Sequence, residues 1–510
     1  MNIPFCDISI DSVESKERIK KGIDDIFQRS DYISGRSVKQ FEDAFATYIG
    51  TKHCVGVANG TDALEIAIES LQLKEDSKIL VQGNSYIATA LAVINQRIRY
   101  KLELVDVDKE TNMIDIEDLH RKMMDAKVLI ITHLFGFMPN MDRLLHVCEE
   151  NHILLIEDCA QAHGAQWKSQ KAGTFGIVSC FSFYPTKNLG AFGDGGAIVT
   201  SDSILYNWIR QRANMGSIIR NQFNIIGRNS RLDTIQALVL YEKLPQLDKA
   251  NEKRRLIAML YTALLQSIPD IKILEYDRNC QPVYHLYVIR AKRRNELQEH
   301  LKQHGITSLI HYPTCIGKTT AFANIVQATT PNCEELSNEI LSLPMYPVLL
   351  GDMPAIQYVT NTIRQFYQHS SMSLHTSQLV TSIIHGKSGR LHAVNQMKLP
   401  PIKRMFYVDG FDDVTLPVER GNHCNVNTNE YLTVLDGAIL LQVEHKDGNM
   451  ITSLLLKNDS IYIHHNTWIR YTILHPHTRL IVLCDTTYDE QMTEHDYNVF
   501  KGIFNSSRSS

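Results

Sequence analysis

Strand-like apolar runs alternate with helical segments over residues 78–200. The runs read KILVQ, LELVDVD, VLIITHLFG, ILLIEDC, CFSFYP and GAIVT. This alternation predicts a mostly parallel sheet with helices on both faces. In sheets of this kind, ligands bind beyond the carboxyl ends of the strands. The pattern therefore predicts an α/β domain and also the edge of its sheet where a site should lie.

A strand, a glycine turn and a helix are predicted just before this sheet. Residues 54–58 are strand-like, the turn reads NGTD, and ALEIAIESL places its apolar residues on one helical face. Such a helix start can bind an anion, because its free N–H groups point outward with the helix dipole behind them. The alternative is that Thr61 or Asp62 only caps the helix.

The pattern changes twice after residue 247. A helix, a strand and a second helix are predicted next, from DKANEKRRLIAMLYTALL, VYHLYVIRA and ELQEHLKQHG in that order. These elements indicate a smaller α+β lobe. The polar stretch QHSSMS predicts a linker, and short strands then recur between turns with no long helix. We therefore predict a large domain over 1–247, a small lobe over 248–367, a linker over 368–375 and an all-β domain over 376–510.

Composition and charge limit the class of protein. Lysine and arginine total 52 against 56 acids, a net charge of -4, which argues against nucleic acid as a partner. No apolar run reaches the roughly 18 to 20 residues of a membrane span, and the N-terminus has no apolar signal segment. Ten scattered cysteines without a CxxC pair indicate reduced thiols. We expect a cytoplasmic enzyme that does not bind a membrane.

An acid and a lysine are predicted to meet at the carboxyl edge of the sheet. Asp158 follows the apolar run ILLI, and Lys187 follows the strand CFSFYP by a few residues. A lysine amine can form an imine with an aldehyde cofactor and can move a proton between carbon and nitrogen. A carboxylate beside a pyridine nitrogen keeps that nitrogen protonated. The alternatives are a capping aspartate and a solvated surface lysine.

Seven motifs resemble the pyridoxal-phosphate-dependent sugar aminotransferases of the DegT/DnrJ/EryC1/StrS family. Over residues 35–346 they are NGTDAL, SYIATALAV, HLFG, EDCAQAHGA, FSFYPTKNLGAFGDGGAIVT, NSRLDTIQA and IHYP, in the family's order. The resemblance implies an α/β fold type I aminotransferase, active as a homodimer or higher oligomer with cofactor sites near the interface. Some relatives have histidine at the position of Lys187 and act as dehydratases, so the lysine favours transamination.

The same resemblance assigns roles to single residues. It implies that Lys187 forms the internal imine, Asp158 pairs with the pyridine nitrogen and Gln161 reaches the ring hydroxyl. Further cofactor contacts are implied for Tyr86, which stacks on the ring, and for a phosphate site made by Gly60, Thr61, the backbone of Asp62, Ser182 and, from the neighbouring subunit, Asn229. His311 and Tyr312 match a segment near the substrate, although a buried structural pair is the alternative.

The C-terminal motifs resemble the sugar 3,4-ketoisomerases, cupin-like jelly-roll enzymes that act on nucleotide-linked 4-keto-6-deoxy sugars. The motifs are IKRMFYVDG, RGNHCN, DGAILLQVE and YIHHNTWIRY, within residues 379–497. The resemblance implies that Arg420 contacts substrate and that His423 acts as a base. Asn425 departs from the family, which has a second inward histidine there. Either His423 suffices, or isomerase activity has been lost; the missing histidine also argues against a metal.

Together the two resemblances imply a function in amino-sugar synthesis, for O-antigen or another glycan. The expected reaction transfers an amino group from glutamate to the 3-keto carbon of a dTDP-linked 6-deoxyhexose, with pyridoxal phosphate as cofactor. One alternative is a bifunctional enzyme in which the isomerase domain is also active. The other is that the C-terminal domain only binds sugar nucleotide or supports the oligomer.

Overall fold

The computed structural model describes residues 1–368, apart from residues 11, 220, 327 and 328, and the strand segments of the C-terminal part. These segments are 404–408, 418–425, 430–445, 450–456, 460–463, 467–474, 478–484 and 493–494. The chain forms two compact units, Met1–Ala258 with Ile268–Phe366, and Met259–Ser267 with Tyr367–Ser510.

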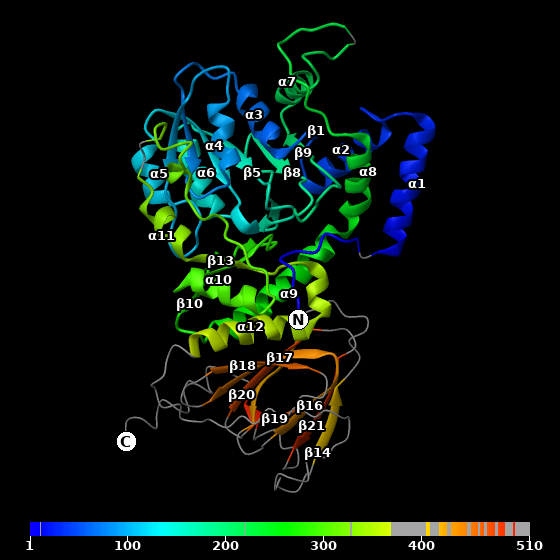
Figure 1. The fold of residues 1–510 in the computed structure, drawn as a ribbon, viewed down its shortest axis with the longest axis vertical. Coiled ribbons are helices and arrows are strands. Elements are labelled where there is room, and N and C mark those ends of the chain that lie inside the picture. The colour runs from blue at the N-terminus through cyan, green and yellow to red at the C-terminus, as the bar shows by residue number, and fades with distance from the viewer. Residues whose placement is uncertain are drawn as a thin grey trace. The chain divides into compact units, whose positions relative to one another are not determined.

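A seven-stranded sheet forms the centre of the first unit, in the order β1-β9-β8-β5-β4-β2-β3 (Figure 1). Its strands are β1 (His53–Val57), β2 (Lys78–Gln82), β3 (Lys101–Val105), β4 (Ala126–Thr132), β5 (Leu154–Asp158), β8 (Val178–Ser182) and β9 (Gly196–Thr200). β3, β2, β4, β5 and β8 pair in parallel, while β9 is antiparallel to both β8 and β1. The predicted, mostly parallel sheet is therefore confirmed.

Apolar residues on alternate positions of each strand fill two cores, one on each face of the sheet. In β4, Leu129 and Ile131 pack into one core, and Val128 and Ile130 pack into the other. The first core is covered by α2 (Arg36–Ile49), α5 (Ile116–Lys122), α6 (Met141–Glu150) and α8 (Thr234–Lys243). The second is covered by α3 (Gly60–Ser70), α4 (Ile87–Ile94) and α7 (Ser203–Ala213). Because both faces are covered, the central strands carry apolar residues on both of their sides.

A smaller lobe follows the sheet along the chain. Its antiparallel sheet is β10 (Ile271–Ile273), β12 (Tyr287–Ala291) and β13 (Ile340–Leu343), in that order. The helices of this region are α9 (Leu247–Leu265), α10 (Arg294–Gln303), α11 (Pro331–Glu339) and α12 (Met353–Gln368). The long helix α1 (Val13–Arg29) lies near the N-terminus. The remaining elements are short: β6 (Gln166–Trp167), β7 (Gln170–Lys171), β11 (Cys280–Gln281), η1 (Leu134–Gly136), η2 (Leu244–Gln246), η3 (Ile316–Lys318) and η4 (Pro347–Gly351).

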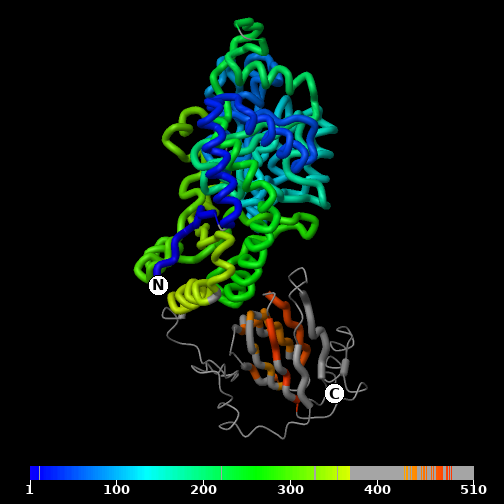
Figure 2. The backbone as a smooth tube through the Cα atoms, turned by 90° about the vertical axis from the view of Figure 1, so that its right-hand side faces the viewer, coloured from blue at the N-terminus to red at the C-terminus, as the bar shows by residue number. Residues whose placement is uncertain are grey.

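The N-terminal segment lies along this lobe (Figure 2). Ile3 N–H donates to Gly305 O over 2.8 Å, and Thr307 N–H donates back to Ile3 O over 3.0 Å. Met345 N–H donates to Phe5 O over 3.2 Å. The first residues are therefore fixed beside the lobe before the chain enters α1.

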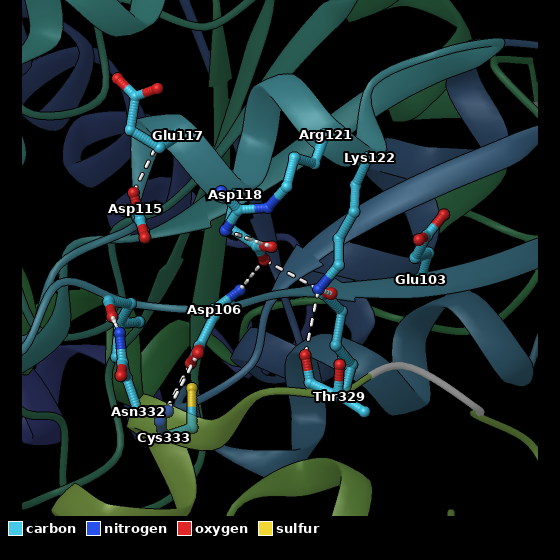
Figure 3. A network of polar contacts seen from close by, with 12 residues as sticks. Glu103, Asp106, Asp115, Glu117, Asp118, Arg121, Lys122, Thr329, Asn332 and Cys333 are labelled. Atoms are coloured by element: carbon cyan, nitrogen blue, oxygen red, sulfur yellow. Dashed lines mark hydrogen bonds and ion pairs between the residues drawn. The ribbon is translucent and has the colours of Figure 1, made fainter.

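A polar network anchors α11 to the end of β3 (Figure 3). The carboxylate of Asp106 accepts hydrogen bonds from the N–H groups of Asn332 and Cys333, both over 2.9 Å. Asp118 accepts from Asp106 N–H over 2.7 Å and from Lys122 Nζ over 2.8 Å. Thr330, the N-cap residue of α11, makes no side-chain hydrogen bond to the helix. The carboxylate of Asp106 therefore accepts hydrogen bonds from free N–H groups at this helix start.

The second unit contains two antiparallel sheets. One has the order β14-β21-β16-β19 and the other β18-β17-β20-β15-β22. Their strands are β14 (Arg404–Val408), β15 (Val418–Asn425), β16 (Glu430–Asp436), β17 (Ala438–His445), β18 (Met450–Leu456), β19 (Ser460–Ile463), β20 (Thr467–Ile473), β21 (Arg479–Cys484) and β22 (Thr493–Glu494). Apolar residues of both sheets form one core, so the predicted all-β domain is confirmed. Residues 369–375 of the predicted linker lie outside the described residues.

Two broader expectations from composition can be compared with the described residues. The nine cysteines described there are all free, and eight of them are buried. Within the same residues, no helix is long and apolar enough to cross a membrane.

Candidate active site

Asp158 is the last residue of β5 and lies at the carboxyl edge of the sheet. Its side chain is buried, and Oδ2 accepts hydrogen bonds from Thr89 Oγ1 over 2.8 Å and Thr132 Oγ1 over 3.4 Å. Oδ1 accepts from Ala160 N–H over 3.1 Å. Three donors from two strand ends and a helix therefore hold this carboxylate in one orientation.

Lys187 lies in the loop between β8 and β9, and its backbone N–H donates to Tyr184 O over 2.8 Å. Burial lowers the pKa of Lys187 to about 8, and the nearby carboxylate of Asp158 opposes this shift. A substantial fraction of the amine is therefore neutral near pH 7 to 8, the form that attacks a carbonyl. The structure thus brings the two residues to the same edge, as fold logic predicts.

The start of α3 has a different cap from the one considered in the sequence. Asn59 is the N-cap residue, and its side chain accepts from Asp62 N–H over 2.8 Å. The Asp62 carboxylate instead pairs with Arg228 over 3.1 Å. The alternative that Thr61 or Asp62 caps this helix is therefore wrong, and both lie in its first turn.

Two glycines allow the backbone to come close at this helix start. A Cβ on Gly60 would lie 2.7 Å from Ser182 Cβ, and a Cβ on Gly196 would lie 2.4 Å from Asn59 O. Ser182, at the end of β8, therefore lies directly against the first residue of α3. Gly60, Thr61 and Ser182, which are proposed phosphate contacts, thus form one cradle of hydroxyl and N–H donors.

Gln161 and two tyrosines join the sheet edge to the small lobe. Gln161 Oε1 accepts from Phe135 N–H over 2.6 Å, and its Nε2 donates to Tyr312 Oη over 3.1 Å. The rings of Tyr312 and Tyr86 lie 5.3 Å apart at 39°, and Tyr86 is 54% exposed. Burial raises the pKa of Tyr312, so its hydroxyl stays protonated and can donate to a ligand.

Three histidines lie within electrostatic reach of Lys187. Burial, with a smaller effect of Lys187, lowers the pKa of His163 to about 3 and that of His311 to about 4. The pKa of His285 falls well below its usual value, again mainly through burial. His311 Nδ1 lies 2.9 Å from Ser342 Oγ. These rings are therefore neutral near pH 7 and add polar groups around the amine without adding charge.

Sequence reasoning missed three of these residues. His163 lies inside the motif EDCAQAHGA and could have been singled out there. Thr89 likewise lies inside the motif SYIATALAV. His285 carries no local signal, because it reaches the site only through the folding of distant segments. His285 Nδ1 lies 3.1 Å from Asn188 Oδ1, next to the lysine.

Asn229 is exposed and makes an isolated bridge with Asn214. Among the described residues, no hydrogen bond joins its side chain to Asp158 or Lys187. Its expected role in a neighbouring subunit's phosphate site stays a prediction.

In the second unit, β15 carries Arg420, His423 and Asn425. The ladder between β15 and β20 shifts between Gly421 and His423. The side chains of these three residues lie outside the described part, as do the histidines at 464, 465, 475 and 477. The expectations for Arg420 and His423 therefore stay predictions. Glu430, at the start of β16, is buried, and the thiol of Cys484 lies 4.0 Å from its Oε1.

One buried group has metal-ligand chemistry within the described residues: His133, Glu157 and Cys159. The carboxylate of Glu157 already accepts several hydrogen bonds from the protein. Glu157 accepts hydrogen bonds from the N–H groups of Gly173, Phe175 and Gly176 and from Ser179 Oγ, and it lies 2.8 Å from His133 Nε2. This group therefore fixes the loop after β7 rather than forming an open ligand set.

The residues at the sheet edge fit pyridoxal phosphate. Asp158 has a fixed, buried carboxylate that could face a pyridinium nitrogen, and Lys187 has an amine with a lowered pKa that could hold the cofactor. The cradle at Gly60 and Ser182 offers donors to a phosphate, and Tyr86 presents an aromatic face that can cover a planar ring. When bound, the cofactor supplies an electron sink for amino-group transfer.

Comparison with known proteins agrees with this site. Residues 13–364 match the model of the DegT/DnrJ/EryC1/StrS aminotransferase family, and residues 373–505 match the family described as WxcM-like, C-terminal. The chain is 36% identical to the dTDP-3-amino-3,6-dideoxy-alpha-D-galactopyranose transaminase of Aneurinibacillus thermoaerophilus, over 68% of the chain and 95% of the relative.

Two further similarities cover the same part of the chain. It is 33% identical to the dTDP-3-amino-3,4,6-trideoxy-alpha-D-glucose transaminase of Streptomyces venezuelae, over 71% of the chain and 96% of the relative. The crystal structure of S. venezuelae DesV in complex with a ketimine intermediate superposes with a TM-score of 0.69 at 33% identity, covering 72% of this chain and 99% of DesV.

The family match covers well over half of the chain and contains the whole sheet edge described above. The C-terminal match adds a cupin-like domain of the sugar-isomerase type. The chain therefore belongs to the DegT/DnrJ/EryC1/StrS aminotransferase family and is a pyridoxal-phosphate-dependent sugar aminotransferase with a WxcM-like C-terminal domain.

Proposed function

We propose that the enzyme transfers the amino group of glutamate to the 3-keto carbon of a dTDP-linked 6-deoxyhexose. The observation that carries this proposal is the fusion of the Lys187 site to an isomerase-type domain over residues 373–505. Moving a keto group between carbons 4 and 3 produces the group that a 3-aminotransferase consumes. The names of the relatives, which are transaminases of dTDP-linked 3-amino sugars, support the nucleotide and the position.

The residues of the site can perform the proton transfers of this reaction. Lys187 Nζ can take up the proton that leaves the α carbon of glutamate and can deliver a proton to carbon 3 of the sugar, and a pKa of about 8 suits a base at neutral pH. Asp158 would hold the proton on the ring nitrogen of the cofactor, since Thr89 and Thr132 fix its carboxylate. Tyr312 can donate from its protonated hydroxyl to a substrate oxygen.

The C-terminal domain has two possible roles in this scheme. In the first, it makes the 3-keto sugar, so that the chain is bifunctional. In the second, Asn425 has removed a needed base, because an amide cannot take up a proton near neutral pH, and the domain binds sugar nucleotide or supports the oligomer. The departure at Asn425 favours the second role.

Product analysis with two substrates tests both parts of the proposal. The full chain, loaded with cofactor, is incubated with glutamate and either the dTDP-3-keto or the dTDP-4-keto 6-deoxyhexose. We expect a 3-amino sugar and 2-oxoglutarate from the 3-keto substrate, and none from the 4-keto substrate unless Asn425→His restores isomerisation. Amination at carbon 4, or turnover only with UDP-linked or GDP-linked sugars, would contradict the proposed substrate.

A further inference from the structure

A cavity of about 330 Å³ lies beside the cofactor lysine. Its walls are residues 6–10, 12 and 15 of the N-terminal segment, the loop that carries Lys187, and the first turns of α9. Residue Lys187 itself lines the cavity. The cavity is therefore next to the chemistry, and the backbone bonds of Ile3 and Phe5 to the small lobe hold its N-terminal wall in place.

The walls of this cavity are strongly basic. Lys243, Lys249, Lys253 and Arg254 all line it, and among its described lining residues Asp7 is the only acid. Surface lysines are ordinarily mixed with acids, so four cations around one concave site create a positive potential inside it. A ligand that carries more than one negative charge would best match this potential.

Arg254 provides a second, independent indication of an anionic ligand. It is 6% exposed, and its Nη1 donates to Met345 O over 2.9 Å. Its Nε is buried and has no hydrogen-bond partner among the described residues. Burial lowers the pKa of Arg254 only to about 10, so the guanidinium stays charged at neutral pH. A buried donor without an acceptor is unfavourable, and an anion in the cavity can relieve this.

Two other groups add donors to the same space. Lys243 Nζ donates to Gly190 O over 2.5 Å and retains two further protons for a ligand. α1 begins at this cavity, where the N-cap residue Ser12 and the first-turn residue Ser15 line the wall. The positive end of this 17-residue helix therefore also faces the site.

We propose that this cavity binds the diphosphate of the nucleotide-linked sugar. The inference rests on the proposed function and deepens it. A diphosphate carries more net negative charge than glutamate, whose ammonium group offsets one of its two carboxylates, and therefore fits four cations better. The keto carbon at position 3 is two carbons from the anomeric carbon that bears the diphosphate. A sugar that presents this carbon at Lys187 must therefore place its diphosphate close to the lysine, as the cavity does.

Calorimetric titration of the full-length holoenzyme with dTDP tests the site directly. Lys249→Ala and Lys253→Ala should each raise the Kd for dTDP about tenfold, since each removes a charged donor. Thymidine, which lacks the diphosphate, should bind weakly to all forms. The matched control is Lys302→Ala, on the exposed face of α10 and outside the cavity, which should leave the Kd unchanged. An unchanged Kd in both cavity variants would overturn the proposal.

Steady-state kinetics then separate the diphosphate from the amino donor. The two cavity variants should raise KM for the sugar nucleotide about tenfold and leave KM for glutamate unchanged. A rise in KM for glutamate alone would assign the cavity to the donor carboxylate and overturn the proposal. Arg254→Gln provides a further test, because it keeps a donor for Met345 O while removing the charge.

Failure of the diphosphate proposal can be distinguished from failure of the proposed function. If no amino sugar forms but the cavity variants still weaken dTDP binding, the reaction is wrong and the diphosphate site stands. If the wild-type enzyme makes the 3-amino sugar and the variants bind dTDP normally, the function stands and the diphosphate site is wrong.

Discussion

As the proposed imine-forming residue, Lys187 must react as a neutral amine, yet it lies near the carboxylate of Asp158, which favours the charged form. Burial lowers this pKa and Asp158 raises it. His163, His285 and His311 lie near the amine and, because they are neutral near pH 7, add no charge beside it. The resulting pKa of about 8 gives a usable fraction of free amine at neutral pH.

The rate at which the apoenzyme captures pyridoxal phosphate should report this pKa. Only the neutral amine attacks the aldehyde, so the rate should rise about tenfold per pH unit below pH 8 and level off above it. An ordinary lysine, with a pKa of 10.5, would give no plateau in this range. Asp158→Asn removes the group that raises the pKa, so the plateau should begin at lower pH. Stopped-flow absorbance measures these rates, and a plateau that moves upward in this variant would contradict the assignment.

Thr89 should position Asp158 for the cofactor. Thr89→Val keeps the shape of the side chain but removes the 2.8 Å hydrogen bond to Oδ2, so the Kd for pyridoxal phosphate should rise about tenfold. Thr89→Ser keeps the hydroxyl and should bind the cofactor nearly as well as the wild type. Fluorescence titration of the apoenzyme gives both values. Equal affinities in the two variants would mean that the threonine acts only by packing.

At the level of elements, a single aspartate joins two distant parts of the chain. Asp106 follows β3, and its carboxylate caps α11, more than 220 residues later. Thr330, the N-cap residue of α11, makes no side-chain hydrogen bond to the start of this helix. This helix leads directly into β13, which pairs with β12 in the small lobe. The contact therefore holds part of the lobe against the large sheet.

Removing this cap should lower stability measurably. Asp106→Ala leaves the two N–H groups of Asn332 and Cys333 without acceptors, which should reduce the free energy of unfolding by about 1 to 2 kcal/mol. Asp106→Asn keeps one acceptor and should lose less. Glu117→Ala, an exposed acid of the same region, is the control. Melting temperatures provide the comparison, and equal values for Asp106→Ala and the control would contradict the capping role.

Local patterns predict the elements better than they predict how the elements pair. The apolar runs identify β2, β4, β5 and β8, because buried parallel strands are continuously apolar. No local pattern shows that β9 is antiparallel to its neighbours, because an apolar run such as GAIVT fits a parallel or an antiparallel strand. The motif NGTD does not decide which residue caps α3, because Asn59, Thr61 and Asp62 all suit a helix start.

The same limit applies to the site. Asp158 and Lys187 follow strand ends, so the fold pattern predicts that they meet. Thr89 and His285 reach the same space from α4 and from the segment before β12, which only the tertiary structure brings together. The cation of Arg254 in a cavity beside Lys187 is likewise invisible in the sequence, where DKANEKRRL reads as a solvated helix.

At the level of the whole molecule, the exposed segment before Asn229 indicates how subunits could share a site. Met215, Ile218, Ile219, Phe223 and Ile226 are all more than half exposed. Such a concentration of apolar side chains on one loop is typical of a protein interface. We expect a twofold partner to bring Asn229 of each chain to the phosphate cradle of the other.

Mixing two inactive variants tests this shared site. Lys187→Ala and Asn229→Ala should each be impaired alone, but refolded as a 1:1 mixture they should regain about one quarter of the wild-type activity, because half of the dimers carry one intact site. The specific activity of the mixture, measured against each variant alone, gives the result. Activity equal to the mean of the two variants would place Asn229 in its own subunit's site or outside any site.

The most direct test of the account is to locate the cofactor on the chain. The holoenzyme is reduced with borohydride, which fixes the cofactor to its lysine, and is then digested and analysed by mass spectrometry. We predict a pyridoxyl phosphate group on the peptide that contains Lys187, and its absence from Lys187→Ala. Attachment to a different lysine, or no attachment in the wild-type protein, would contradict the central claim.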